Sequence, residues 1–264
     1  MSPDAEIKLH GVGTGLAAPT LLFLHAGVAD WRSWSVVMPL VADVGAPRAY
    51  DRRGFGATPP ASAPFRHLDD LQGVLERCGG EPAWLIGNSM GGALAIDAAL
   101  ELPERVAGLI LLAPAVSGAP ELTGLDPVTA ELEAAIESAD AAGDLARLNR
   151  LETRLWLDGP QQDGRVTGAA RDLVLDMNAL ALRGEGPHDG ASGLDAWARL
   201  EEIAVPTTVV WGEHEIPAVV DRCRRIVARV PHAIGHHMRG VAHLPSVERP
   251  ADVAALVHAA LRNP

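Results

Sequence analysis

Short apolar runs alternate with helical patterns along most of this chain, and this alternation restricts the fold more than any other feature. Five of the runs are predicted to be strands: Thr20–Leu24, Pro47–Tyr50, Ala83–Gly87, Val106–Ala113 and Thr207–Gly212. They are almost continuously apolar, which is typical of strands that are buried on both faces. We therefore predict an α/β fold in which a mostly parallel central sheet is flanked by helices.

A long helical segment interrupts this alternation after the fourth predicted strand. Asp126 and Pro127 form a typical helix start, because aspartate caps the first turn and proline fits the first helical position. Apolar residues then recur at helical spacing in two stripes, Val128, Leu132 and Ile136, followed by Leu145, Leu148, Leu151 and Leu155. We predict that residues 117–197 are an inserted all-helical cap and that residues 1–116 and 198–264 form the core.

The composition excludes several classes of partner and cofactor. The 264 residues carry a formal net charge of -12, whereas nucleic acids and anionic membranes are bound through clustered positive charge, so we expect neither partner. The single lysine, Lys8, does not follow a glycine-rich loop, which excludes a P-loop nucleotide site. The two cysteines, Cys78 and Cys223, are too few for a disulfide framework. Their spacing is not that of a metal-binding motif, so we expect no metal.

The apolar runs also bear on the compartment. Even the longest of them, such as Leu109–Val116, are too short to cross a bilayer. The first ten residues lack the basic start and apolar core of a signal peptide. We therefore expect a soluble, cytoplasmic protein. The sequence leaves open whether it forms a homodimer.

The segment Gly87–Gly91 is the most informative for chemistry and reads Gly-Asn-Ser-Met-Gly. An apolar strand precedes it, and a helical pattern follows it and stops before Pro103. This is the context of a nucleophile elbow, a sharp turn where larger side chains at the flanking glycines would collide with neighbouring backbone. We predict that Ser89 is a nucleophile, placed at a helix N-terminus whose free N–H groups favour developing negative charge.

A nucleophilic serine needs partners, because its hydroxyl group is a poor nucleophile at neutral pH. A base must take the proton, and an acid must orient the base. In strand–turn–helix hydrolases the acid and then the histidine follow the serine along the chain. Glu213 and Glu215 come directly after the last predicted strand, and His243 stands near the C-terminus. His243 is therefore the predicted base, and either glutamate is a candidate acid.

Together these residues resemble the α/β-hydrolase superfamily over nearly the whole chain. The landmarks are Leu24-His25-Ala26-Gly27, Asp51-Arg52-Arg53-Gly54-Phe55-Gly56, Gly87–Gly91, Gly212–Glu215, and His243 with Glu248-Arg249-Pro250. The resemblance implies an α/β-hydrolase fold with an inserted helical cap and a catalytic triad of Ser89, Glu215 and His243. The family's acid usually stands three residues after the glycine that ends its strand, which favours Glu215 over Glu213. Most members have aspartate at that position.

The resemblance also implies an oxyanion hole and a substrate pocket. The backbone N–H groups of Gly27 and Met90 match the family's oxyanion donors. The loop reads His-Ala-Gly instead of the commoner His-Gly-x, so the second donor could shift to Val28, which is also a candidate for substrate binding. Trp31 and Trp156 are expected to line an apolar pocket between core and cap.

These roles predict a serine hydrolase that cleaves a carboxylic ester or lactone of a small apolar or aromatic substrate through an acyl-enzyme, without a cofactor. One alternative is a carbon–carbon bond hydrolase of the same fold. Such enzymes share the Gly-Asn-Ser-Met-Gly-Gly run but usually carry a loop rich in glycine and proline where this chain has His-Ala-Gly-Val-Ala-Asp. A second alternative is a ligand-binding sensor that turns over slowly or not at all. The cap contains three arginines, Arg147, Arg150 and Arg154, which leave room for one carboxylate on the substrate.

Overall fold

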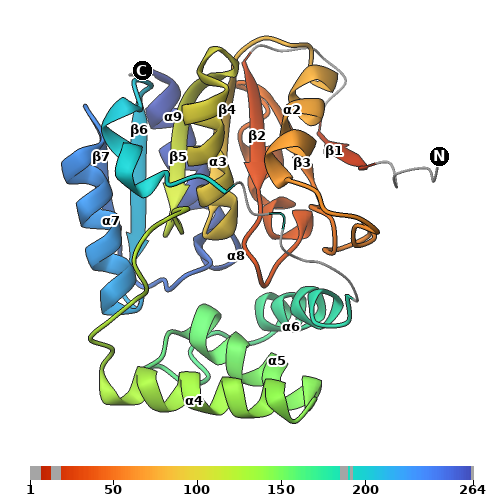
Figure 1. Ribbon diagram of the computed structural model, residues 1–264, viewed down its shortest axis with the longest axis vertical. Helices are drawn as coiled ribbons and strands as arrows, with labels where there is room; N and C mark the ends of the chain where they lie inside the picture. Colours follow the sequence, from red (N-terminus) through yellow and green to blue (C-terminus); the bar gives the residue numbers. More distant parts are fainter. Residues whose placement is uncertain (1–6, 13–18, 185–189, 191–192, 263–264) are drawn as a thin grey trace.

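The computed structural model describes residues 7–12, 19–184, 190 and 193–262. Within these ranges the chain forms a seven-stranded sheet with the order β1-β3-β2-β4-β5-β6-β7 (Figure 1). The strands are β1 (Leu9–Gly11), β2 (Thr20–Leu24), β3 (Ala46–Tyr50), β4 (Ala83–Asn88), β5 (Val106–Leu112), β6 (Thr207–Gly212) and β7 (Ile234–Met238). All neighbouring strands are parallel except β1, which pairs antiparallel with β3 at one edge.

The predicted fold class is confirmed, and the five predicted runs coincide with strands β2 to β6. The sheet extends beyond them by one strand at each edge. The short strand β1 lies at one edge, and β7 lies at the other. Four of the five β7 residues are exposed, so this strand lacks the apolar run that marks the buried strands.

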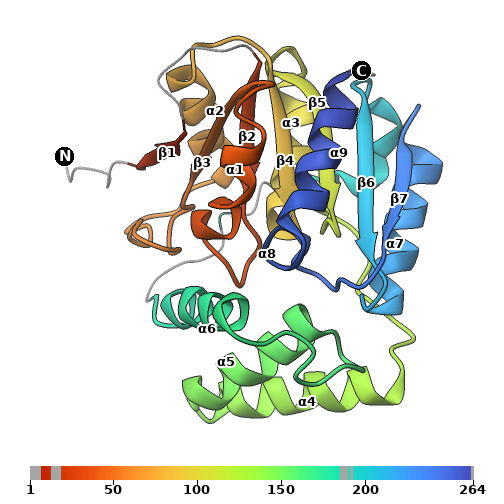
Figure 2. The same cartoon turned by 180° about the vertical axis from the view of Figure 1, so that it is seen from behind.

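Helices cover both faces of the sheet. One face carries α2 (His67–Arg77), α3 (Met90–Glu101) and α7 (Pro217–Arg229), and the other carries α1 (Val37–Leu40) and α9 (Pro250–Arg262) (Figures 1 and 2). Neighbouring side chains of a strand point to opposite faces. In β2, Leu22 and Leu24 belong to the first core, whereas Leu21 and Phe23 belong to the second. This two-sided burial explains why the strand is apolar at consecutive positions.

Between β5 and β6 the chain forms a separate layer of helices, α4 (Pro127–Ala141), α5 (Leu145–Thr153) and α6 (Ala169–Ala181), with a π-helical turn, η3 (Arg154–Asp158). This layer lies beyond the carboxyl ends of the strands (Figure 1). The predicted helix start is present, since the Asp126 carboxylate accepts hydrogen bonds from the N–H groups of Val128 and Thr129 at 3.0 and 3.1 Å. We call residues 117–197 the helical insertion, and these limits stay a prediction.

The remaining helices are short. They are η1 (Trp31–Trp34), η2 (Pro103–Arg105), η4 (Trp197–Glu202) and α8 (Pro245–Glu248). In the part of the chain that the structure describes, no helix has the length and apolar character needed to span a bilayer. In open α/β sheets, ligands bind beyond the carboxyl ends of the strands. In this fold the place for a ligand lies between the loops that follow the central strands and the helical insertion.

Candidate active site

Ser89 occupies a strained turn between β4 and α3. Its φ angle is 52°, in the left-handed region that residues with a side chain rarely adopt. Two hydrogen bonds hold this conformation. The Ser89 N–H donates to the Leu112 carbonyl at 2.9 Å, and the Ala115 N–H donates to the Ser89 carbonyl at 3.0 Å. The end of β5 thus fixes the backbone of the turn, and the Ser89 side chain contributes to the wall of a cavity.

The glycines on either side of Ser89 allow very close backbone packing. A Cβ atom on Gly91 would lie 2.2 Å from the Leu24 carbonyl oxygen of β2. A Cβ atom on Gly87 would lie 2.4 Å from the Gly91 carbonyl oxygen. Neither position accepts a larger residue unless the backbone moves, which is the requirement that the Gly-x-Ser-x-Gly motif imposes.

His243 contacts a carboxylate from the end of β6. Its Nδ1 atom lies 2.6 Å from Oε2 of Glu215, and the two side chains are 5% and 1% exposed. The other Glu215 oxygen accepts a hydrogen bond from the Ile216 N–H at 2.9 Å. Glu213 is exposed and instead accepts a hydrogen bond from the Gly240 N–H at 2.8 Å, which lowers the pKa of its carboxyl group. Of the two candidate acids, Glu215 is the one that contacts the histidine.

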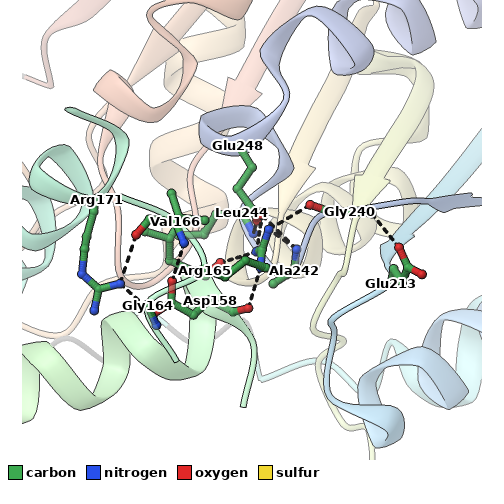
Figure 3. A network of polar contacts seen from close by, with 11 residues as sticks. Asp158, Gly164, Arg165, Val166, Arg171, Glu213, Gly240, Ala242, Leu244 and Glu248 are labelled. Carbon is green, nitrogen blue, oxygen red and sulfur yellow. Dashed lines mark hydrogen bonds and ion pairs between the residues drawn. The ribbon is translucent and has the colours of Figure 1, made fainter. Parts of the chain in front are cut away.

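The loop that carries His243 is held from both sides by one buried carboxylate. Glu248 accepts hydrogen bonds from the N–H groups of Ala242 and Leu244, at 3.0 and 3.3 Å (Figure 3). Its side chain is 3% exposed, and burial raises the pKa of its carboxyl group. Arg165 of the helical insertion forms an ion pair with Glu248 and acts against this rise in pKa. The negative charge of Glu248, which holds the loop, is therefore balanced by an arginine of the helical insertion.

Arg165 also joins the helical insertion directly to this loop. Its guanidinium group donates to the carbonyl of Gly240 at 2.8 Å and to the carbonyls of Leu157 and Asp158 at 2.6 and 2.8 Å (Figure 3). The fully buried Asp158 carboxylate is in turn paired with Arg171 at 2.6 Å. This set of contacts fixes η3 and the following segment against the loop of the candidate base.

Two further contacts reach the backbone of His243 itself. The Asn88 side chain donates to the His243 carbonyl at 3.0 Å and to the Leu112 carbonyl at 2.9 Å. The His243 N–H donates to the Trp156 carbonyl at 3.2 Å. Sequence reasoning did not single out Asn88, although a polar residue at the end of a buried strand, just before the serine, was an available signal. Asn88 joins the nucleophile turn to the histidine loop.

Ser89 and His243 line one cavity of about 340 Å³. Because the Nδ1 atom of His243 faces Glu215, Nε2 is the ring nitrogen that remains for a second partner. Gly27 and Met90 also line the cavity, and a Cβ atom on Gly27 would lie 2.6 Å from the Met90 sulfur atom. The two segments predicted to supply the oxyanion donors are thus in contact.

Two of the three predicted substrate-binding residues line this cavity, and the third lies outside its described lining. Val28 and Trp156 line the cavity, and the Trp156 ring lies 4.5 Å from the His243 ring. Trp31 lies elsewhere: its ring stacks on His10 at 4.0 Å, and its backbone N–H donates to Asp51 at 2.8 Å. Trp31 is therefore not among the described residues that line this cavity, and its contact with a substrate stays a prediction.

The charged lining also differs from the expectation. The predicted arginines Arg147, Arg150 and Arg154 are absent from the described cavity wall, where Glu152 and Asn178 are the polar residues that the helical insertion contributes. Neither was singled out from the sequence, because polar residues on amphipathic helices give no signal that separates a cavity wall from solvent. Within the described ranges, no group of three or more His, Cys, Asp and Glu side chains is arranged to hold a metal ion.

Comparison with known proteins places this chain in a family. Residues 21–256 match the model of the alpha/beta hydrolase family, so the chain belongs to that family and is a hydrolase of the α/β fold. A similar protein is the 2-hydroxy-6-oxononadienedioate/2-hydroxy-6-oxononatrienedioate hydrolase of Cupriavidus pinatubonensis, 28% identical over 91% of this chain and 86% of that protein. Another is the 2-hydroxy-6-oxo-6-phenylhexa-2,4-dienoate hydrolase of Burkholderia cepacia, 26% identical over 88% of this chain and 79% of that protein.

The fold also resembles those of solved hydrolases. A thermophilic esterase from Thermogutta terrifontis superposes with a TM-score of 0.76 and 22% identity, over 99% of this chain and 95% of that structure. At this identity the likeness shows the fold and not the substrate. The choice between bond types therefore depends on the sequence relatives and on the chemistry of the cavity.

Proposed function

We propose that this hydrolase acts by nucleophilic catalysis through Ser89, His243 and Glu215. The supporting observation is the contact between His243 and Glu215 beside a cavity that Ser89 also lines. His243 takes the serine proton, and the serine oxygen forms a bond to the substrate carbonyl carbon. The backbone N–H groups of Gly27 and Met90 stabilise the oxyanion, while Glu215 holds the imidazole tautomer and offsets its positive charge.

The second half of the reaction regenerates the free serine hydroxyl group. Collapse of the tetrahedral intermediate breaks the bond to the leaving group, which takes the proton from His243. Water then gives a proton to His243 and attacks the acyl carbon. The bond to Ser89 breaks, the carboxylic acid leaves, and the proton returns to the serine oxygen.

The first candidate for the bond that breaks is a carbon–carbon bond next to a ketone. The sequence relatives support it, because they match most of this chain and are named as hydrolases of 2-hydroxy-6-oxo dienoates. The run Gly87-Asn88-Ser89-Met90-Gly91-Gly92 also fits that group. The relatives thus favour this alternative over the ester or lactone that the sequence alone predicts.

Ester or lactone cleavage is the second candidate, and two observations favour it. The loop after β2 reads His-Ala-Gly-Val-Ala-Asp and lacks the glycine- and proline-rich sequence that is usual in carbon–carbon bond hydrolases. In addition, the described cavity wall contains Glu152 but no arginine or lysine, whereas a dienoate carries a carboxylate. Both bond types use the same three residues.

A fluorophosphonate probe tests the nucleophile independently of the substrate. We expect labelling of Ser89 that is lost in Ser89→Ala, and a fall in kcat of roughly 10⁴- to 10⁶-fold in that variant. Equal labelling of the wild type and Ser89→Ala would refute the proposed nucleophile.

A substrate panel then separates the candidates. It contains 2-hydroxy-6-oxo-6-phenylhexa-2,4-dienoate, p-nitrophenyl esters and lactones, with product analysis by mass spectrometry. Cleavage of the dienone that depends on Ser89 supports the first candidate, and cleavage of esters or lactones alone supports the second. Labelling of Ser89 without turnover of any compound would contradict both and favour a binding protein.

A further inference from the structure

The helical insertion brings two polar side chains to a cavity wall that is otherwise mostly apolar. Glu152 comes from α5 and Asn178 from α6. Apart from the polar groups of Ser89, His243 and the Trp156 indole, these are the polar side chains of the described lining. A few placed polar groups in an apolar pocket fix the orientation of a ligand and decide which ligand is accepted.

The hydrogen bonds around Asn178 determine what these side chains offer. The Asn149 amide nitrogen donates to the Leu175 carbonyl at 2.9 Å, so the Asn149 amide oxygen is the atom that accepts. The Asn178 amide nitrogen donates to that oxygen at 3.0 Å and to Glu152 Oε2 at 2.7 Å. Both of its hydrogens are therefore used within the protein, and the Asn178 oxygen is the group that remains for a ligand.

Glu152 offers the same kind of group. An ionised carboxylate only accepts hydrogen bonds, and one Glu152 oxygen is already bonded to Asn178. Burial raises the pKa of Glu152, the hydrogen bond from Asn178 lowers it, and the neighbouring carboxylate Asp140 raises it. When Glu152 is ionised, the wall formed by α5 and α6 presents acceptors and one negative charge to the cavity.

We infer that Glu152 and Asn178 form a selectivity site for a hydrogen-bond donor on the substrate, such as a hydroxyl or ammonium group. The inference rests on the proposed function and concerns the group that is recognised, whichever bond breaks. A donor here pairs with the acceptors, whereas a carboxylate places like charges together in a partly buried site. The favoured substrate is a carbonyl compound whose distal end carries a hydroxyl or amino group and not a carboxylate.

The two bond candidates make this inference specific. In a 2-hydroxy-6-oxo dienoate, the carboxylate stands on the carbon next to the 2-hydroxyl group, so a site that disfavours a carboxylate counts against this substrate and supports the second candidate. In an ester or lactone, a hydroxyl or amino group on the acyl chain is a donor that the site accepts. Glu152 therefore acts as a specificity-determining residue and takes no part in the proton transfers at Ser89.

The test uses three fluorophosphonates whose six-carbon chains end in a methyl, an ammonium or a carboxylate group. The rate constant for labelling Ser89 is divided by the hydrolysis rate of the same probe in buffer, which corrects for intrinsic reactivity. We expect the ammonium probe to label wild-type protein faster than the carboxylate probe by about 10- to 100-fold, the ratio that one hydrogen bond to a charged group supplies.

Substitution of Glu152 gives the second arm. Glu152→Gln keeps the size of the side chain, removes its charge and adds a donor, so the ratio should fall to about 3-fold or less. Glu131→Gln is the matched control, because it removes one negative charge from an exposed position of α4 in the same insertion. The ratio should stay at the wild-type value in this control.

The outcomes separate the two proposals. Failure of every probe to label Ser89 would refute the proposed function and the inference that rests on it. Efficient labelling with equal rates for the ammonium and carboxylate probes would refute the inference alone. The same holds if Glu131→Gln lowers the ratio as much as Glu152→Gln, since the effect would then come from overall charge. The wild-type ratio decides the inference even if Glu152→Gln fails to fold.

Discussion

Replacement of Arg165 by methionine tests whether the helical insertion supports the loop of the candidate base. Methionine keeps the apolar stem of the side chain but removes the ion pair with Glu248 and the donors to three backbone carbonyls. Removal of one partner from a buried ion pair costs about 3–5 kcal/mol. Arg165 is 18% exposed, and Glu248 keeps its bonds to the loop backbone, so we expect the lower end of this range, about 3 kcal/mol.

The loss should depend on pH in a defined direction. Burial raises the pKa of Glu248 above its ordinary value of 4.5, and Arg165 lowers it. Without Arg165 the pKa in the folded state is higher still. A group whose pKa is raised by folding favours the folded state most when it is protonated, and this contribution is lost as the pH rises through the folded pKa. The deficit of Arg165→Met should therefore be smallest near pH 5 and grow towards pH 8.

Urea unfolding at several pH values, followed by circular dichroism, measures this deficit as a difference from the wild type. Arg249→Met is the matched control, because its ion pair with Asp252 is about half exposed and should contribute at most about 1 kcal/mol. A deficit for Arg165→Met that is independent of pH, or no larger than that of Arg249→Met, would refute the reasoning. Such a result would mean that Glu248 does not depend on Arg165 for its charge.

Other substitutions test the remaining contacts. Glu215→Gln should lower kcat by about 10⁴-fold, whereas Glu213→Gln should stay within about 3-fold, and the opposite order in steady-state kinetics would move the acid role to Glu213. Gly91→Ala places a Cβ atom 2.2 Å from the β2 backbone and should lower the free energy of unfolding by about 1–3 kcal/mol, measured in urea. Asn88→Ala leaves the His243 carbonyl without its side-chain donor and should lower kcat by about 10-fold at unchanged KM, with circular dichroism to verify folding.

The central sheet could be predicted because burial on both faces leaves a direct mark on the sequence. Consecutive apolar residues such as Leu21 to Leu24 serve the two cores in alternation. The edge strand β7 carries no such mark, because four of its five residues are exposed. Fold class thus follows from the central strands, whereas the edges of the sheet depend on pairing between distant segments.

The candidate site likewise contains some residues that the sequence reveals and others that only the fold reveals. Ser89 is visible in the sequence because its turn demands small neighbours at fixed positions, and His243 follows from the order of the motifs. Glu152 and Asn178 are not visible, since only the packing of α5 against α6 places them at a cavity. Trp31 is close in sequence to the loop after β2, but its ring stacks on His10 of the edge strand, and only the fold shows this position.

The attachment of Arg165 to Glu248 limits how freely the parts of this protein could be exchanged. A helical insertion that touched the core only at its two ends could be replaced by one of another shape, and substrate range would change while the reactive centre stayed intact. Here residues 117–197 supply the cation that balances a carboxylate of the core. A chimera that receives an insertion without an arginine at this place would also need a neutral residue at position 248. Recombination among relatives should therefore transfer the two positions together.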